Sequence, residues 1–132
     1  EIYSLLEQII NKKYNNISSM IYDTILKVNT YLEIDTKIIE TSSIYNNNNL
    51  NRANRIINIC KYHKCKNYIN PIGGQDIYSK KIFEENGINL NFLKTNNFTY
   101  NQYNSSFVSN LSMIDVLMFN SKENVRILLN SF

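Results

Sequence analysis

Apolar residues recur with helical spacing at both ends of the chain. The first stretch keeps one face apolar at Ile2, Leu5, Leu6, Ile9 and Ile10. A polar break at residues 14–16 offers an asparagine N-cap, and a second apolar face continues to about residue 32. Residues 112–119 and 122–129 have the same spacing. The pattern predicts a helical opening over residues 1–33 and closing helices over residues 110–132.

The middle of the chain alternates short β-type segments with helical ones. Residues 37–42, 67–70 and 88–92 are short and β-rich or alternating. Helices are expected at about residues 50–60 and 77–85, and Gly87 stands where a helix C-terminal glycine belongs. Strands separated by helical crossovers favour parallel pairing. We therefore expect an α/β fold with a small three-stranded, mostly parallel sheet flanked by helices. The expected order is α-α-β-α-β-α-β-α-α, with a βαβαβ core over residues 37–94.

The length of 132 residues fits a single α/β domain. Three strands would leave two open sheet edges, which natural proteins rarely leave bare. The chain also begins at Glu1 inside a helical pattern. These two observations favour a second interpretation, in which residues 1–132 are part of a larger α/β protein.

Composition excludes several classes of function. The net charge is only +3 and the basic residues are scattered, which argues against nucleic acid as a partner. No apolar run approaches the length of a membrane span and no signal peptide is visible, so we predict a soluble cytoplasmic protein without a membrane partner. Two cysteines make no disulfide framework. The sequence identifies neither a cofactor nor an oligomeric state, and both stay unknown.

The first candidate site is a glycine turn. Two of the three glycines and the only proline stand together as Pro71-Ile72-Gly73-Gly74, between a predicted strand and a predicted helix. The chain therefore needs either a special φ/ψ or a close approach to its backbone at this point. In one interpretation the backbone N–H groups of residues 74–76 bind a phosphate or carboxylate, and Gln75 adds its side-chain amide. In the other, the turn is a tight connection that needs a positive φ, and Asp76 caps the following helix.

The second candidate is Asp115, which interrupts the apolar run of residues 113–119. A carboxylate partly buried there is costly unless it is paired, and it would suit acid–base chemistry. Ser112 and Asp115 also match a capping box, in which Asp115 bonds back to the Ser112 amide. The two roles are compatible, because a cap can share a pocket.

Other polar residues are weaker candidates. Arg55 borders an apolar stripe and could bind a substrate phosphate, pair with Asp115 or form a surface salt bridge. Tyr100 and Gln102 could bind a sugar by stacking and amide hydrogen bonds.

Cys60, His63 and Cys65 follow a metal-like spacing, but no fourth ligand follows at a useful distance. Cys60 falls on an apolar helix face, where we expect a core residue. His63 stands among lysines at a helix end, where contact with the helix dipole explains it. We predict no metal site and no nucleophile–base pair here.

Four motifs in order resemble the WbqC-like family. They are residues 54–61 (NRIINICK), 68–78 (YINPIGGQDIY), 100–102 (YNQ) and 107–120 (FVSNLSMIDVLMFN). The resemblance is to the C-terminal portion of the family and covers roughly residue 50 to the end, while the opening helices fit more loosely. The family usually has glycine where this chain has Lys64, and often where it has Ser121.

The resemblance implies a bacterial protein of O-antigen or other surface-polysaccharide biosynthesis. It implies an enzyme, or part of one, that modifies a sugar or sugar nucleotide, and a transferase of acyl or aminoacyl groups fits this description. Asp115 is then the catalytic candidate. The ligand-binding candidates are Arg55, Gly73, Gly74, Gln75, Asp76, Tyr100, Gln102 and Ser112.

The alternative is a non-catalytic module that binds a ligand or partner. In that case the chemistry lies in the family's N-terminal segment with a His-Gln-Pro-like motif, which has no counterpart here.

Overall fold

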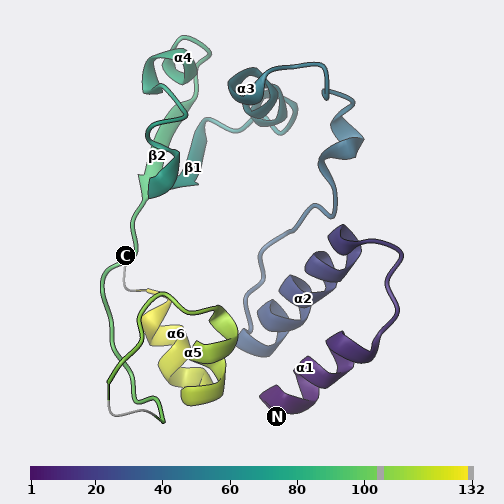
Figure 1. Ribbon diagram of the computed structural model, residues 1–132. Coiled ribbons are helices and arrows are strands. Elements are labelled where there is room, and N and C mark those ends of the chain that lie inside the picture. The colour runs from purple at the N-terminus through teal and green to yellow at the C-terminus, as the bar shows by residue number, and fades with distance from the viewer. Residues whose placement is uncertain (104–105, 131–132) are drawn as a thin grey trace. The chain divides into compact units, whose positions relative to one another are not determined.

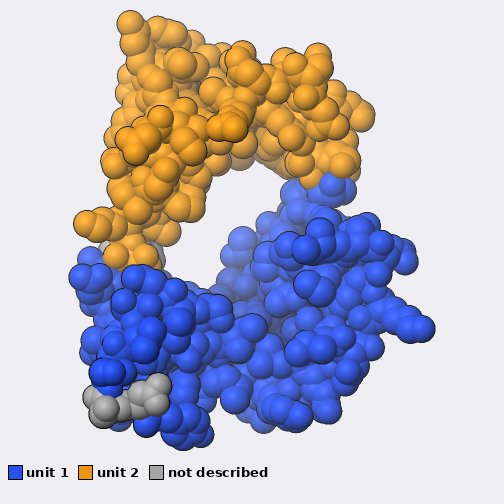
Figure 2. Space-filling model, viewed as in Figure 1, with its two compact units in different colours: residues 1–41, 96–131 blue, residues 42–95, 132 orange. Residues whose placement is uncertain are grey.

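The computed structural model describes residues 1–103 and 106–130 (Figure 1). The described residues divide into two compact units, shown in two colours in Figure 2. Unit 1 contains residues 1–41 and 96–130, and unit 2 contains residues 42–95. Each unit has a hydrophobic core of its own, as a folded module requires.

Unit 1 is helical. Its helices are α1 (Ile2–Asn11), α2 (Ile17–Leu32), α5 (Met113–Phe119) and α6 (Lys122–Leu128). Their apolar faces meet in a core whose buried members are Ile2, Leu32, Val116, Leu117 and Val125. The opening and the closing helices of the chain, labelled in Figure 1, therefore share one core.

Side-chain caps fix where two of these helices begin. Asn16 accepts a hydrogen bond from the backbone N–H of Ser19 at 2.9 Å, which confirms the predicted break and N-cap before α2. Ser121 accepts one from the N–H of Asn124 at 3.3 Å before α6. Because Ser121 is an extended N-cap residue, the joint between α5 and α6 requires no glycine.

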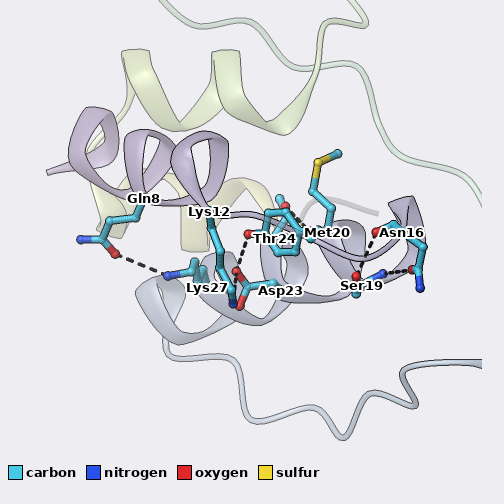
Figure 3. A network of polar contacts seen from close by, with 9 residues as sticks. Gln8, Lys12, Asn16, Ser19, Met20, Asp23, Thr24 and Lys27 are labelled. Carbon is cyan, nitrogen blue, oxygen red and sulfur yellow. Dashed lines mark hydrogen bonds and ion pairs between the residues drawn. The ribbon is translucent and has the colours of Figure 1, made fainter.

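A polar network joins α1 to α2 (Figure 3). The Tyr14 hydroxyl donates to Asp23 Oδ2 at 2.6 Å, and Lys12 Nζ lies 3.2 Å from the same oxygen. The hydrogen bond from Tyr14 is the main reason that the pKa of Asp23 is lowered, and Lys12 lowers it further. Desolvation and Asp23 raise the pKa of Tyr14 to about 12, so the hydroxyl remains a donor at neutral pH.

Unit 2 has α/β character. It contains α3 (Arg52–Tyr62), β1 (Asn67–Pro71), α4 (Lys80–Glu84) and β2 (Asn89–Leu93), with 3-10 helices η1 (Ser42–Tyr45) and η2 (Ile72–Gly74). β1 pairs with β2 in parallel, with Tyr68 opposite Leu90. The buried members of the core are Ile57, Cys60, Phe83, Ile88 and Leu90. This confirms the strands expected near residues 67–70 and 88–92 and their parallel pairing.

The third predicted strand is wrong. Residues 37–41 form no strand, and η1 begins at Ser42, so the sheet in the described part of the chain has two strands. Ile39 is 38% exposed, and the segment belongs to unit 1 while both strands belong to unit 2. β-propensity alone makes no strand, because the backbone groups need a neighbouring strand to bond. The observed order of helices and strands is α-α-α-β-α-β-α-α.

The helix predicted over residues 77–85 begins later than expected. The Gly74 carbonyl accepts from the N–H groups of both Ile77 and Tyr78, which closes a turn, and α4 starts only at Lys80. Its end follows the prediction. Gly87 has a φ of 73° and closes a Schellman motif, in which the Ile88 N–H bonds the Phe83 carbonyl.

The same C-terminal motif occurs twice more without glycine. Glu33 after α2 has a φ of 58°, and Lys64 after α3 has a φ of 55°. At the second site the N–H of Cys65 bonds the carbonyl of Cys60 at 2.8 Å, the six-to-one bond of a Schellman motif. Lys64 therefore adopts the backbone conformation that favours glycine.

Within the part of the chain that the structure describes, no helix combines the length and the hydropathy needed to cross a membrane.

Candidate functional site

The predicted site residues belong to two different units. Unit 1 holds Tyr100, Gln102, Ser112 and Asp115, whereas unit 2 holds Arg55 and the glycine turn. The residues of unit 1 come together around Asp115.

The Asp115 carboxylate accepts two side-chain hydrogen bonds. The Tyr100 hydroxyl donates to Oδ2 at 2.5 Å, and Gln102 Nε2 donates to the same oxygen at 2.8 Å. Burial and the bond to Asp115 raise the pKa of Tyr100, which keeps the hydroxyl protonated at neutral pH. Both of these hydrogen bonds use Oδ2 of the carboxylate.

The orientation of the Gln102 amide is set by the backbone of Val108. Gln102 Oε1 accepts from the Val108 N–H at 2.8 Å, and Nε2 donates to the Val108 carbonyl at 3.1 Å. A backbone N–H can only donate, so the oxygen of the amide must face Val108 and the nitrogen must face Asp115. Val108 thus fixes which end of Gln102 meets the carboxylate.

Asp115 lies in the wall of an open cavity of about 550 Å³. The cavity is lined by Tyr103, Leu111, Ser112, Ile114, Asp115, Met118 and Phe119. The rings of Tyr103 and Phe119 meet edge to face with their centroids 5.0 Å apart. Such a wall, mostly apolar and aromatic with one or two polar groups, is typical of a small-molecule site.

Tyr100 also lines a second cavity of about 410 Å³, together with residues of α6. The hydrogen bond between Tyr100 and Asp115 therefore connects residues in the walls of two cavities of unit 1.

The capping-box prediction for Ser112 and Asp115 is wrong. Ser112 is the N-cap residue of α5, but its side chain makes no capping bond. The Asp115 carboxylate is instead bonded to Tyr100 and Gln102. Those partners lie 15 and 13 residues earlier in the chain, so the local Ser-x-x-Asp pattern could not reveal them.

The glycine turn of unit 2 has neither the positive φ nor the Asp76 cap of the second interpretation, and its binding of a ligand stays a prediction. Gly73 and Gly74 have no positive φ, and Asp76 precedes the α4 N-cap residue, Ser79. Gly74 is buried, and a Cβ placed on it would lie 2.0 Å from Asn70 Nδ2, so the turn needs glycine for close approach. The Gln75 N–H already bonds the Ile72 carbonyl. Gln75 and Asp76 are both exposed.

Arg55 binds neutral groups of its own unit. Its Nε donates to Asn47 Oδ1 at 3.1 Å and its terminal nitrogen to Ser42 Oγ at 2.7 Å. Asn47 is 4% exposed and also bonds Asn58 at 2.9 Å. The predicted surface salt bridge is absent from the ion pairs of the described residues. Arg55 fastens the loop before α3 to that helix.

The sulfur and imidazole groups near the end of α3 do not converge. Cys60 is buried in the core of unit 2, as predicted, while Cys65 is exposed. His63 is the C-cap residue of α3, and its Nε2 lies 2.6 Å from the Tyr45 hydroxyl. No cluster of potential metal ligands occurs among the described residues.

Sequence reasoning missed Tyr103, Phe119 and Val108. The first two lie in the cavity wall beside Asp115, and the third orients Gln102. Tyr103 gave no distinct signal because tyrosine is common throughout the chain, and a backbone contact such as that of Val108 leaves no trace in residue type.

The chain matches the WbqC-like protein family over residues 1–127, which includes the opening helices as well as the later motifs. It belongs to that family. No curated protein and no solved structure matches the chain.

Proposed function

We propose that this protein is an enzyme, or part of one, that modifies a sugar or sugar nucleotide in the biosynthesis of O-antigen or another bacterial surface polysaccharide. The observation that carries the proposal is the Asp115 carboxylate, which lies in the wall of a cavity beside Tyr103 and Phe119. A carboxylate accepts hydrogen bonds from sugar hydroxyl or amino groups, and aromatic rings pack against the apolar faces of a sugar.

Asp115 is the proposed catalytic residue, with Oδ1 facing the ligand and Oδ2 held by Tyr100 and Gln102. In an acyl or aminoacyl transfer, a sugar hydroxyl or amine attacks the carbonyl carbon of an activated ester or thioester. Asp115 takes the proton of the attacking group as the new bond to carbon forms. The bond to the alcohol or thiol breaks, and that leaving group departs with the returned proton.

The remaining candidates receive supporting roles in the proposal. Ser112 contributes a hydroxyl to the cavity wall, and Tyr100 and Gln102 act as positioning residues through Asp115. Unit 2 supplies a separate ligand-binding turn, formed by Gly73, Gly74, Gln75 and Asp76. Arg55, also in unit 2, supplies a positive charge for an anionic part of the ligand.

A second candidate function is a binding module without chemistry of its own. It is favoured by the neighbourhood of Asp115, whose two hydrogen-bonding side chains are a tyrosine and an amide rather than a nucleophile. A module of this kind binds the same ligands but leaves the transfer to another segment or protein.

The test is mass spectrometry of sugar nucleotides and polysaccharide from cells with and without the gene, complemented by wild type, Asp115→Asn or Asp35→Asn. Asp35 is an exposed carboxylate of unit 1 outside the cavity and serves as the matched control. The proposal expects one acylated or aminoacylated sugar species to disappear without the gene. Wild type and Asp35→Asn should restore it and Asp115→Asn should not. An unchanged profile would contradict the proposal, and full rescue by Asp115→Asn would favour the binding module.

A further inference from the structure

The described wall of the Asp115 cavity carries a negative charge and no positive charge. Among the described residues that line it, Asp115 is the only charged side chain, and none of them is a lysine or an arginine. None of the ion pairs among the described residues includes Asp115. Its two side-chain partners, Tyr100 and Gln102, are neutral donors.

A wall of this composition selects against phosphate and in favour of a cation. A phosphate would meet the negative charge of Asp115 and no positive charge in the described wall, and this repulsion between like charges is unfavourable. An ammonium group at Oδ1 would supply the missing charge. The aromatic rings of Tyr103 and Phe119 beside it favour a cation as well.

We propose that this cavity binds the amine-bearing part of the substrate, an amino sugar or an aminoacyl group with a free amine, and not the nucleotide diphosphate. The inference rests on the proposed function and narrows its substrate class. The ammonium lies against Asp115 Oδ1, and the apolar body of the ligand contacts Ile114 and Met118 in the wall. Tyr100 and Gln102 position the carboxylate by holding Oδ2.

The inference has a direct binding test on the purified chain. Glucosamine, N-acetylglucosamine and glucose are titrated separately by NMR, since they differ at one position as amine, amide and hydroxyl. Glucosamine should bind about tenfold more tightly than either neutral sugar, a difference of about 1.4 kcal/mol. In Asp115→Asn this preference should vanish, whereas Asp35→Asn should keep it.

Circular dichroism checks that Asp115→Asn is folded. If that variant does not fold, the titration of wild type still tests whether the chain selects an amine. Equal binding of all three sugars by wild type, or no binding at all, overturns the inference. A gene-dependent change confined to sugars without a free amine would overturn it as well, while the proposed sugar-modifying function survived.

Discussion

Lys64 occupies a position where glycine should stabilise the protein. Its φ of 55° lies in the left-handed region, where a side chain beyond Cα costs about 1–2 kcal/mol. Glycine removes this cost but gains freedom in the unfolded chain, which offsets roughly 0.5–1 kcal/mol. We therefore expect Lys64→Gly to raise the free energy of unfolding by about 0.5–1 kcal/mol.

The assay is urea unfolding followed by circular dichroism, with Lys64→Ala as the matched control. Alanine keeps Cβ and therefore the conformational cost, while both variants remove the same charge from the end of α3. Hydrogen exchange at the Asn89 amide measures the stability of unit 2 by itself, because this N–H bonds the Lys66 carbonyl of the same unit at 2.7 Å. Slower exchange is expected in Lys64→Gly.

The reverse substitution tests the same reasoning at Gly87. Its φ is 73°, and a Cβ placed there meets no atom within 4 Å, so the loss in Gly87→Ala is purely conformational. We expect a destabilisation of about 1 kcal/mol. If Lys64→Gly were no more stable than Lys64→Ala, the assignment of a left-handed Lys64 would be refuted.

Two further predictions concern packing and charge. Gly74→Ala should lower the free energy of unfolding by about 1–3 kcal/mol because the new Cβ collides with Asn70, whereas Gly73→Ala, where a Cβ meets nothing within 4 Å, should be near neutral in the same urea assay. Lys122 is the main cause of the lowered pKa of Glu33, so Glu33 contributes stability above its ordinary pKa of 4.5, and this contribution is lost as the pH falls below that value. The urea midpoint of wild type should therefore fall more on acidification than that of Glu33→Gln, and high salt should shrink the difference because Glu33 is exposed; parallel pH profiles would contradict this assignment.

The sequence predicted those parts of the fold that depend on neighbouring residues. The apolar spacing of α1 and α2, the Asn16 cap and the glycine after α4 are all local patterns, and the structure confirms them. The segment at residues 37–42 failed because a strand depends on a partner elsewhere in the chain. For the glycine pair the sequence predicts either a special φ/ψ or a close approach to the backbone, and at Gly74 the structure confirms the close approach, by Asn70.

The same distinction holds for the candidate site. Asp115 was identified because a carboxylate stands out in an apolar run. Its bonds to Tyr100 and Gln102 bring together a loop and a helix, and no spacing rule specifies such a pair. The left-handed conformation of Lys64 is likewise invisible in residue type, because lysine rarely adopts it.

Two hydrogen bonds join the Gln102 side chain to the Val108 backbone, and they couple the folding of this loop to the hydrogen bonding of the Asp115 carboxylate. Gln102 Nε2 donates to both the Val108 carbonyl and Asp115 Oδ2, so unfolding of the loop around Val108 also takes a donor from the carboxylate. By linkage, any ligand that binds Asp115 more tightly when that donor is present must stabilise the folded loop by an equal free energy. Protection of the Val108 amide from hydrogen exchange is thus a remote reporter of occupancy at Asp115, and mutations in the loop can tune affinity without touching the ligand.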